Sequence, residues 1–203
     1  VISRSEPAPV ARVHGTKRPV IVGFGPAGMF AALFLSRHGC SPVVIERGKK
    51  IEERVRDVEN YFNGSALAAY TNVQFGEGGA GTFSDGKLYS GVSDERRSYV
   101  LDSFVRAGAH REILYASHPH VGTDRLRGVV TAIRQEIEEA GGTFLFGRTV
   151  TEIETENGRM KGIRHAASAG RMSDSEFLET ENVILAIGHS ARDTFRFLHE
   201  KGI

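Results

Sequence analysis

The residues with the clearest chemical meaning form a glycine-rich turn, Gly23-Phe24-Gly25-Pro26-Ala27-Gly28. A dinucleotide pyrophosphate binds backbone N–H groups at the start of a helix, where side chains would block its approach. In this spacing the first glycine makes the turn, the second leaves room for phosphate and the third lets the helix pack on its strand. The motif predicts that a pyrophosphate lies over Gly23, Gly25, Pro26, Ala27 and Gly28.

An acidic residue follows at the distance that such a site requires. Glu46 lies roughly 20 residues beyond the glycines, at the end of a second apolar run. Its carboxylate can accept hydrogen bonds from the adenosine ribose, and an acid here disfavours the 2′-phosphate of NADP. We therefore expect Glu46 and its neighbour Arg47 at the adenosine end of the site.

A second glycine-rich stretch covers residues 75–88, FGEGGAGTFSDGKL. No Gly-Lys-Ser/Thr follows its first glycine at the Walker spacing, which excludes a nucleoside-triphosphate P-loop. Backbone with so few side chains can pass close to a flat or anionic ligand, and the alternative is a flexible surface loop. We predict contacts with the cofactor from Gly78, Gly79, Ala80, Gly81, Thr82 and Ser84.

The elements that must position these residues follow from hydrophobic periodicity. A strand at 19–22, a helix at 27–38 ended by Gly39 and a strand at 42–46 form a βαβ unit with parallel strands. Further helices are expected at 51–60, 95–107 and 123–140, the last capped by Thr123 or Asp124.

The second half of the chain predicts mainly strands. Residues 143–146 and 183–187 are expected to add parallel strands, the latter ending at Gly188. Between them an antiparallel meander is predicted at 149–155, 160–166 and 176–180, with a hairpin turn at 156–158. A final helix begins near Arg192, with Ser190 or Asp193 as its cap. The fold class is therefore α/β, a Rossmann-like domain with an inserted antiparallel meander.

Composition narrows the function classes. The chain has 203 residues, 40% of them hydrophobic and 25% charged, which is typical of a globular protein. A net charge of +1 gives no field that selects nucleic acid, and no apolar run is long enough to span a membrane. With Cys40 as the one cysteine, neither an intrachain disulfide nor a redox-active cysteine pair can form, and we expect a cytoplasmic location.

The sequence favours FAD over NAD at this site. Pro26-Ala27-Gly28 resembles the variant of the motif found in flavoproteins that bind two dinucleotides, which also follow the first βαβ unit with a long crossover and a meander. An NAD-dependent dehydrogenase would more often continue with regular βα units, and this alternative stays open.

Longer strings carry a more specific resemblance. Residues 76–88, 120–126 and 186–195 resemble a bacterial family of largely uncharacterised FAD-dependent dehydrogenases, in the glutathione-reductase-like superfamily of FAD/NAD(P)-binding proteins. The resemblance runs from Pro19 to the end of the chain. It implies that the ribose lies on Glu46, the adenine against the backbone near Val150, residues 78–84 beside the pyrophosphate and flavin, and Gly188 facing the cofactor. The family's later segment over the flavin is absent, so we expect this chain to be part of a longer protein.

The expected function is that of the FAD-binding part of a flavoprotein oxidoreductase, inactive as this chain alone. Residues 1–18 are expected to form a linker or arm and 19–203 the incomplete FAD-binding domain. The longer protein would pass a hydride or electrons between FAD and an organic or nicotinamide partner, with NAD(P)H a candidate donor. A dinucleotide-binding module without catalysis is the second alternative. No catalytic residue or metal site is predicted, and the polar candidates for tuning a flavin are Asp85, Lys87, His118, His120 and His189.

Overall fold

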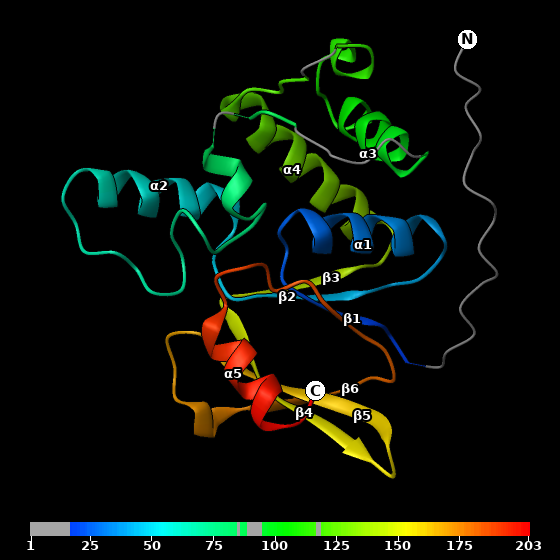
Figure 1. The fold of residues 1–203 in the computed structure, drawn as a ribbon, viewed down its shortest axis with the longest axis vertical. Coiled ribbons are helices and arrows are strands. Elements are labelled where there is room, and N and C mark those ends of the chain that lie inside the picture. Colours follow the sequence, from blue (N-terminus) through cyan, green and yellow to red (C-terminus); the bar gives the residue numbers. More distant parts are fainter. Residues whose placement is uncertain (1–16, 85, 89–94, 117–118) are drawn as a thin grey trace.

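The computed structural model describes residues 17–84, 86–88, 95–116 and 119–203 (Figure 1). The predicted linker, apart from Lys17 and Arg18, lies outside this part of the chain, as do the tuning candidates Asp85 and His118. The guanidinium of Arg18 donates hydrogen bonds to the carbonyls of Ser41, Pro42 and Gly141. These bonds hold Arg18 against the loops that precede β2 and β3.

A four-stranded parallel sheet forms the centre of the fold. Its strand order is β3 (Thr143–Phe146), β2 (Val43–Glu46), β1 (Val20–Val22) and β7 (Val183–Leu185). The strands β1 and β2 are buried along their whole length, which is why their sequences read as continuous apolar runs. The α/β class and the parallel βαβ unit are confirmed.

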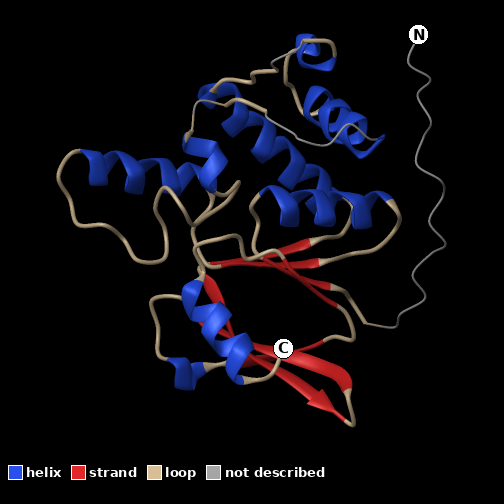
Figure 2. Ribbon diagram, viewed as in Figure 1, coloured by secondary structure: helices blue, strands red, loops and turns tan. Residues whose placement is uncertain are grey.

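Helices and a second sheet cover the two faces (Figures 1 and 2). On one face α1 (Pro26–Arg37) and α4 (Thr123–Glu139) pack on the strands, with α3 (Glu95–Arg106) beyond them. On the other face lie the meander and α5 (Arg192–Glu200). The helix α2 (Ile51–Phe62) extends sideways from this body.

The meander is confirmed as an antiparallel sheet of β4 (Arg148–Glu156), β5 (Arg159–Ala167) and β6 (Glu176–Glu179). Its first turn has φ of 52° at Asn157 and 73° at Gly158. Two successive positive φ values are what a two-residue hairpin turn of type I′ requires, and Asn-Gly adopts them readily.

The predicted N-terminal caps of α4 and α5 are wrong. The residue before α4 is Gly122, and the residue before α5 is Ala191, neither with a side-chain cap. Gly122 has a φ of 78°, next to a hydrogen bond from Val121 N–H to the Gly86 carbonyl, so a tertiary contact with the glycine-rich stretch sets the start of α4. Three short 3-10 helices were also not predicted, namely η1 (Ala80–Phe83), η2 (Arg111–Leu114) and η3 (Met172–Asp174).

Candidate dinucleotide site

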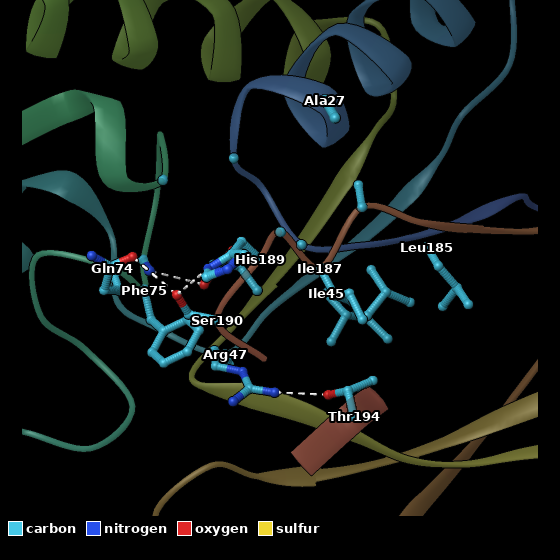
Figure 3. Close-up of a pocket in the computed structure, with 18 of the residues that line it drawn as sticks. Ala27, Ile45, Arg47, Gln74, Phe75, Leu185, Ile187, His189, Ser190 and Thr194 are labelled. Atoms are coloured by element: carbon cyan, nitrogen blue, oxygen red, sulfur yellow. Dashed lines mark hydrogen bonds between the residues drawn. The ribbon is translucent and has the colours of Figure 1, made fainter. Parts of the chain in front are cut away.

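A pocket of about 680 Å³ opens at the carboxyl ends of β1, β2 and β7. This volume lies in the range of small-molecule and cofactor sites, and this edge of an open parallel sheet is where ligands usually bind. Its walls come from the turn after β1, the end of β2, the glycine-rich stretch, the start of β4, the chain after β7 and one side of α5 (Figure 3).

Two glycines of the first motif are required by the packing of the protein itself. A Cβ at Gly23 would meet the carbonyl oxygen of Ala186, and Gly23 has a φ of 97°. A Cβ at Gly28 would meet the carbonyl of Gly23. These positions are glycine because the turn, the helix and the chain after β7 are packed against each other.

Gly25 and Gly81 differ, because no contact with the described residues requires them to be glycine. A Cβ at Gly25 would come no closer than 3.7 Å to another atom, the Cα of Gly79, and its φ of −77° suits any residue. A Cβ at Gly81 would meet no described atom within 4 Å. Both residues line the pocket. Missing side chains at two such positions are expected where a ligand approaches the backbone closely.

The start of α1 offers unpaired hydrogen-bond donors to this space. Gly25 precedes the helix, Pro26 stands in its first turn, and no described side chain caps it. The first turn carries no acidic residue. The amino end of a helix has a partial positive charge and free N–H groups, so the pocket contains the features of an anion site where a pyrophosphate was predicted.

The carboxylate of Glu46 lies beside this turn and is 5% exposed. Its Oε2 accepts a hydrogen bond from the backbone N–H of Phe24 at 2.7 Å. Its Oε1 accepts from the N–H of Gly48 at 2.8 Å and from that of Gly76 at 3.1 Å. Glu46, the residue predicted to bind the ribose, thus also accepts hydrogen bonds from three backbone segments of the protein itself.

The Arg47 side chain crosses to α5 at the edge of the pocket (Figure 3). Its guanidinium donates to Asp193 at 3.1 Å and to Thr194 at 2.9 Å, and lies 4.7 Å from the ring centre of Phe75. Arg47 therefore joins the end of β2 to the amino end of α5, and Asp193 takes part in this contact instead of capping the helix.

Most of the predicted site residues lie together in the pocket. They are Gly23, Gly25, Pro26, Ala27, Glu46, Arg47, Gly79, Ala80, Gly81, Val150 and Gly188. The exceptions are Gly28, Gly78, Thr82 and Ser84. Gly28 packs on the turn, the Thr82 hydroxyl is buried against Gly78, and the Ser84 hydroxyl donates to the carbonyl of Gly81.

Sequence reasoning missed several residues that line the pocket. Arg148 and Thr149 precede the predicted Val150 on β4, and Gln74 and Phe75 precede the predicted glycines. Thr194, Phe195 and Leu198 come from α5. The amphipathic pattern of residues 192–200 indicates a helix with one buried face. It does not indicate that this helix borders the pocket, because that depends on how the helix packs against β4 and the chain after β7.

A buried charged cluster behind the pocket was also missed. Glu77 is fully buried and accepts hydrogen bonds from Ile51 N–H and from Nε of Arg134 on α4, both at 2.7 Å. Arg54 on α2 is fully buried and donates to the carbonyls of Asn72, Val73, Gly76 and Glu77. Burial raises the pKa of Glu77 above its usual range and lowers that of Arg54 to about 10. The cluster fixes residues 72–77 against α2 and α4.

The other polar residues that were considered for tuning a flavin lie in two different parts of the structure. His189 lines the pocket, and its neighbour Ser190 donates to Gln74 at 3.2 Å (Figure 3). Lys87 and His120 instead form an isolated antiparallel bridge before α4 and do not line the pocket. Among the described residues, no group of three His, Cys, Asp or Glu side chains could hold a metal ion.

Residues 18–58 match the model of a family described as an FAD binding domain. This match identifies the cofactor as FAD. The matched segment contains the turn, α1, β2 with Glu46, and Arg47. It thus covers the part of the pocket in which the pyrophosphate and ribose were predicted.

Among curated proteins, the chain is 46% identical over 186 residues to an uncharacterized protein of Clostridium beijerinckii, covering 92% of this chain and 33% of that protein. It is 28% identical over 171 residues to Protein FixC of Salmonella typhi, covering 83% and 36%. The chain spans about a third of the length of these relatives.

Solved structures show the same fold at low identity. The THI4 protein of Thermovibrio ammonificans superposes with a TM-score of 0.60 at 20% identity, covering 92% of this chain and 63% of that chain. A glycerol-3-phosphate dehydrogenase from Bacillus halodurans, complexed with FAD, gives 0.53 at 13% identity, covering 92% and 37%. At these identities the likeness concerns the fold.

No described helix has the length and apolar character needed to cross a membrane.

Proposed function

We propose that this chain is the FAD-binding part of a flavoprotein oxidoreductase, and that the pocket at the carboxyl ends of β1, β2 and β7 holds the adenosine and pyrophosphate of FAD. The observation that carries this proposal is the pair Gly25 and Gly81. Both line the pocket, and the packing of the residues that the structure describes explains neither. The free N–H groups of α1 point to an anionic group in the same space.

Each wall of the pocket has a separate task in this proposal. The backbone of Gly25, Pro26 and Ala27 lies at the pyrophosphate, and Glu46 lies at the ribose. The edge of β4 at Val150 lies at the adenine, with Arg47 and α5 closing that end. Gly79 to Gly81 pass close to the cofactor on the other side, and Gly188 faces it after β7.

The bound flavin would supply hydride or electron transfer, and the residues of this chain would bind and orient it. We infer that the whole protein is an FAD-dependent dehydrogenase of the bacterial family that the sequence resembles. The substantial identity to the Clostridium beijerinckii protein is compatible with this and names no substrate. NAD(P)H as electron donor, a small organic substrate and a cytoplasmic location are parts of this proposal.

The test is to purify the chain, add FAD, pass the mixture through gel filtration and record the visible absorption spectrum. The proposal predicts a two-peaked flavin spectrum that stays with the protein. A parallel titration with NAD⁺ provides the comparison for the NAD-dependent alternative. Retention of NAD⁺ without flavin would contradict the proposal.

The whole protein tests the oxidoreductase half of the proposal; the Clostridium beijerinckii relative is about three times the length of this chain. We expect NADH or NADPH to bleach its bound flavin under anaerobic conditions. Bound FAD that no nicotinamide donor and no organic reductant bleaches would favour a dinucleotide-binding module without catalysis.

A further inference from the structure

The hydrogen bonds of Glu46 are unusual for a ribose ligand. An ionised carboxylate has about four lone-pair positions on its two oxygens. Three are occupied here by backbone N–H groups, from Phe24, Gly48 and Gly76, at 2.7 to 3.1 Å. One position, on Oε2, is left for a ligand. The adenosine ribose presents two adjacent hydroxyl groups, so Glu46 cannot accept a full hydrogen bond from each.

Two of the three N–H groups, those of Phe24 and Gly76, belong to the segments that form the phosphate side of the pocket. Phe24 stands inside the first glycine motif, and Gly76 begins the second glycine-rich stretch. These two segments also touch directly, since Gly78 N–H donates to the Phe24 carbonyl at 2.8 Å. A Cβ at Gly48 would meet the backbone of Gly76, so the chain after β2 packs directly against the second glycine-rich stretch. The Glu46 carboxylate is the charged group at which all three meet.

We propose that Glu46 is a positioning residue for the FAD site: it holds the first glycine motif and the Gly76–Gly81 segment in register, and it gives the ribose at most one hydrogen bond. Gly25 and Gly81 belong to these two segments and line the pocket. The distance between the two glycines therefore depends on the Glu46 carboxylate. This inference rests on the proposed FAD site.

The first arm of the test uses the protein without cofactor. Glu46→Gln places an amide NH₂ against at least one of the three backbone N–H groups and leaves a buried donor unsatisfied. We expect the Tm of the apo-protein to fall by about 5 °C or more, for a chain of this size. The matched control is Glu152→Gln, whose carboxylate is 40% exposed and pairs with Lys201. An apo-protein Tm unchanged by Glu46→Gln would overturn the proposal.

The second arm separates positioning from direct contact by means of FAD and its 2′,3′-dideoxyadenosine analogue. If Glu46 acts through the glycine segments, Glu46→Gln weakens the binding of both ligands by about 10-fold or more, although the analogue has no hydroxyl to bond. If Glu46 acted only as a ribose ligand, the variant would bind the analogue as tightly as the parent chain does. That result would overturn the proposal.

The third arm needs no variant and remains informative if Glu46→Gln fails to fold. The parent chain is titrated with the 2′-deoxyadenosine and 3′-deoxyadenosine analogues of FAD. The proposal predicts a loss of about 10-fold for one of them and little change for the other. Losses of that size for both would overturn the claim of a single bond. A parent chain that binds no FAD would refute the proposed function, whereas the apo-protein arm would still decide the role of Glu46.

Discussion

Arg134 on α4 and Glu77 in the glycine-rich stretch form a hydrogen-bonded ion pair of 2.7 Å, with side chains 8% and 0% exposed. Arg134 also reaches Glu52 on α2 at 2.7 Å. A stretch of chain with little side-chain packing of its own is thus fixed to two helices through charge. The geometry of the pocket wall at Gly76 depends on this pair.

Breaking the pair should destabilise the fold strongly. We expect Glu77→Gln to lower the free energy of unfolding by about 3 kcal/mol, because it removes the one fully buried carboxylate paired with Arg134 and leaves only the more exposed Glu52 and Glu138. Replacing both residues, as Glu77→Gln with Arg134→Met, should recover part of this loss. Urea unfolding of Glu77→Gln, of Arg134→Met and of the double variant measures the coupling. The exposed pair of Lys201 and Glu152 provides a control, and Glu152→Gln should have little effect on stability, because solvent screens this pair. Equal effects of Glu77→Gln and Glu152→Gln would contradict the structure.

The glycines of the first motif should differ in their effects on stability. Gly28→Ala should destabilise the apo-protein severely, because the new methyl group overlaps the carbonyl of Gly23. Gly25→Ala should leave the apo-protein Tm within a few degrees of the parent value. Gly128→Ala, in an open part of α4, is the control and should stabilise slightly, by up to about 1 kcal/mol. Thermal unfolding without FAD gives all three values, and a collapse of Gly25→Ala would show that packing requires this glycine after all.

His165 on β5 should make stability depend on pH. Burial lowers its pKa below the ordinary 6.5, the nearby Arg148 lowers it further, and Glu176 opposes them. The unfolded chain therefore binds a proton more readily than the folded one, and stability is lost as the pH falls from about 6.5 toward the lower folded-state pKa. We expect a smaller loss of stability between pH 7 and 5 in His165→Phe than in the parent chain. Urea unfolding across this range measures the difference, and identical pH profiles would refute the assignment.

Much of the fold could be predicted because its signals are local. The stripe of Val129, Val130, Ile133 and Ile137 gave α4, and Asn157-Gly158 gave the hairpin. The glycine spacing and the acid at the end of β2 predicted residues that line the pocket, since both are short-range features of one βαβ unit.

The rest depends on contacts between residues far apart in the chain. Nothing near Arg134 distinguishes it from a solvated arginine on a helix until α4 is placed over Glu77. Likewise, the sequence could not predict that Glu46 accepts three backbone hydrogen bonds. One of them comes from Gly76, which lies in a stretch without periodicity, so its position depends on the tertiary structure. The 3-10 helix η1 arises in the same stretch and was missed for the same reason.

The most direct test of the FAD site is the dissociation constant for FAD of the parent chain beside that of Gly25→Val, measured by flavin fluorescence at a temperature where both are folded. The backbone dihedrals of Gly25 suit a branched residue and its Cβ would meet no atom closer than 3.7 Å, whereas the side chain would occupy the space assigned to the pyrophosphate. We predict that the variant loses FAD binding by at least about 100-fold while its apo-protein Tm stays near that of the parent. Unchanged FAD affinity in a folded Gly25→Val protein would contradict the placement of the cofactor in this pocket.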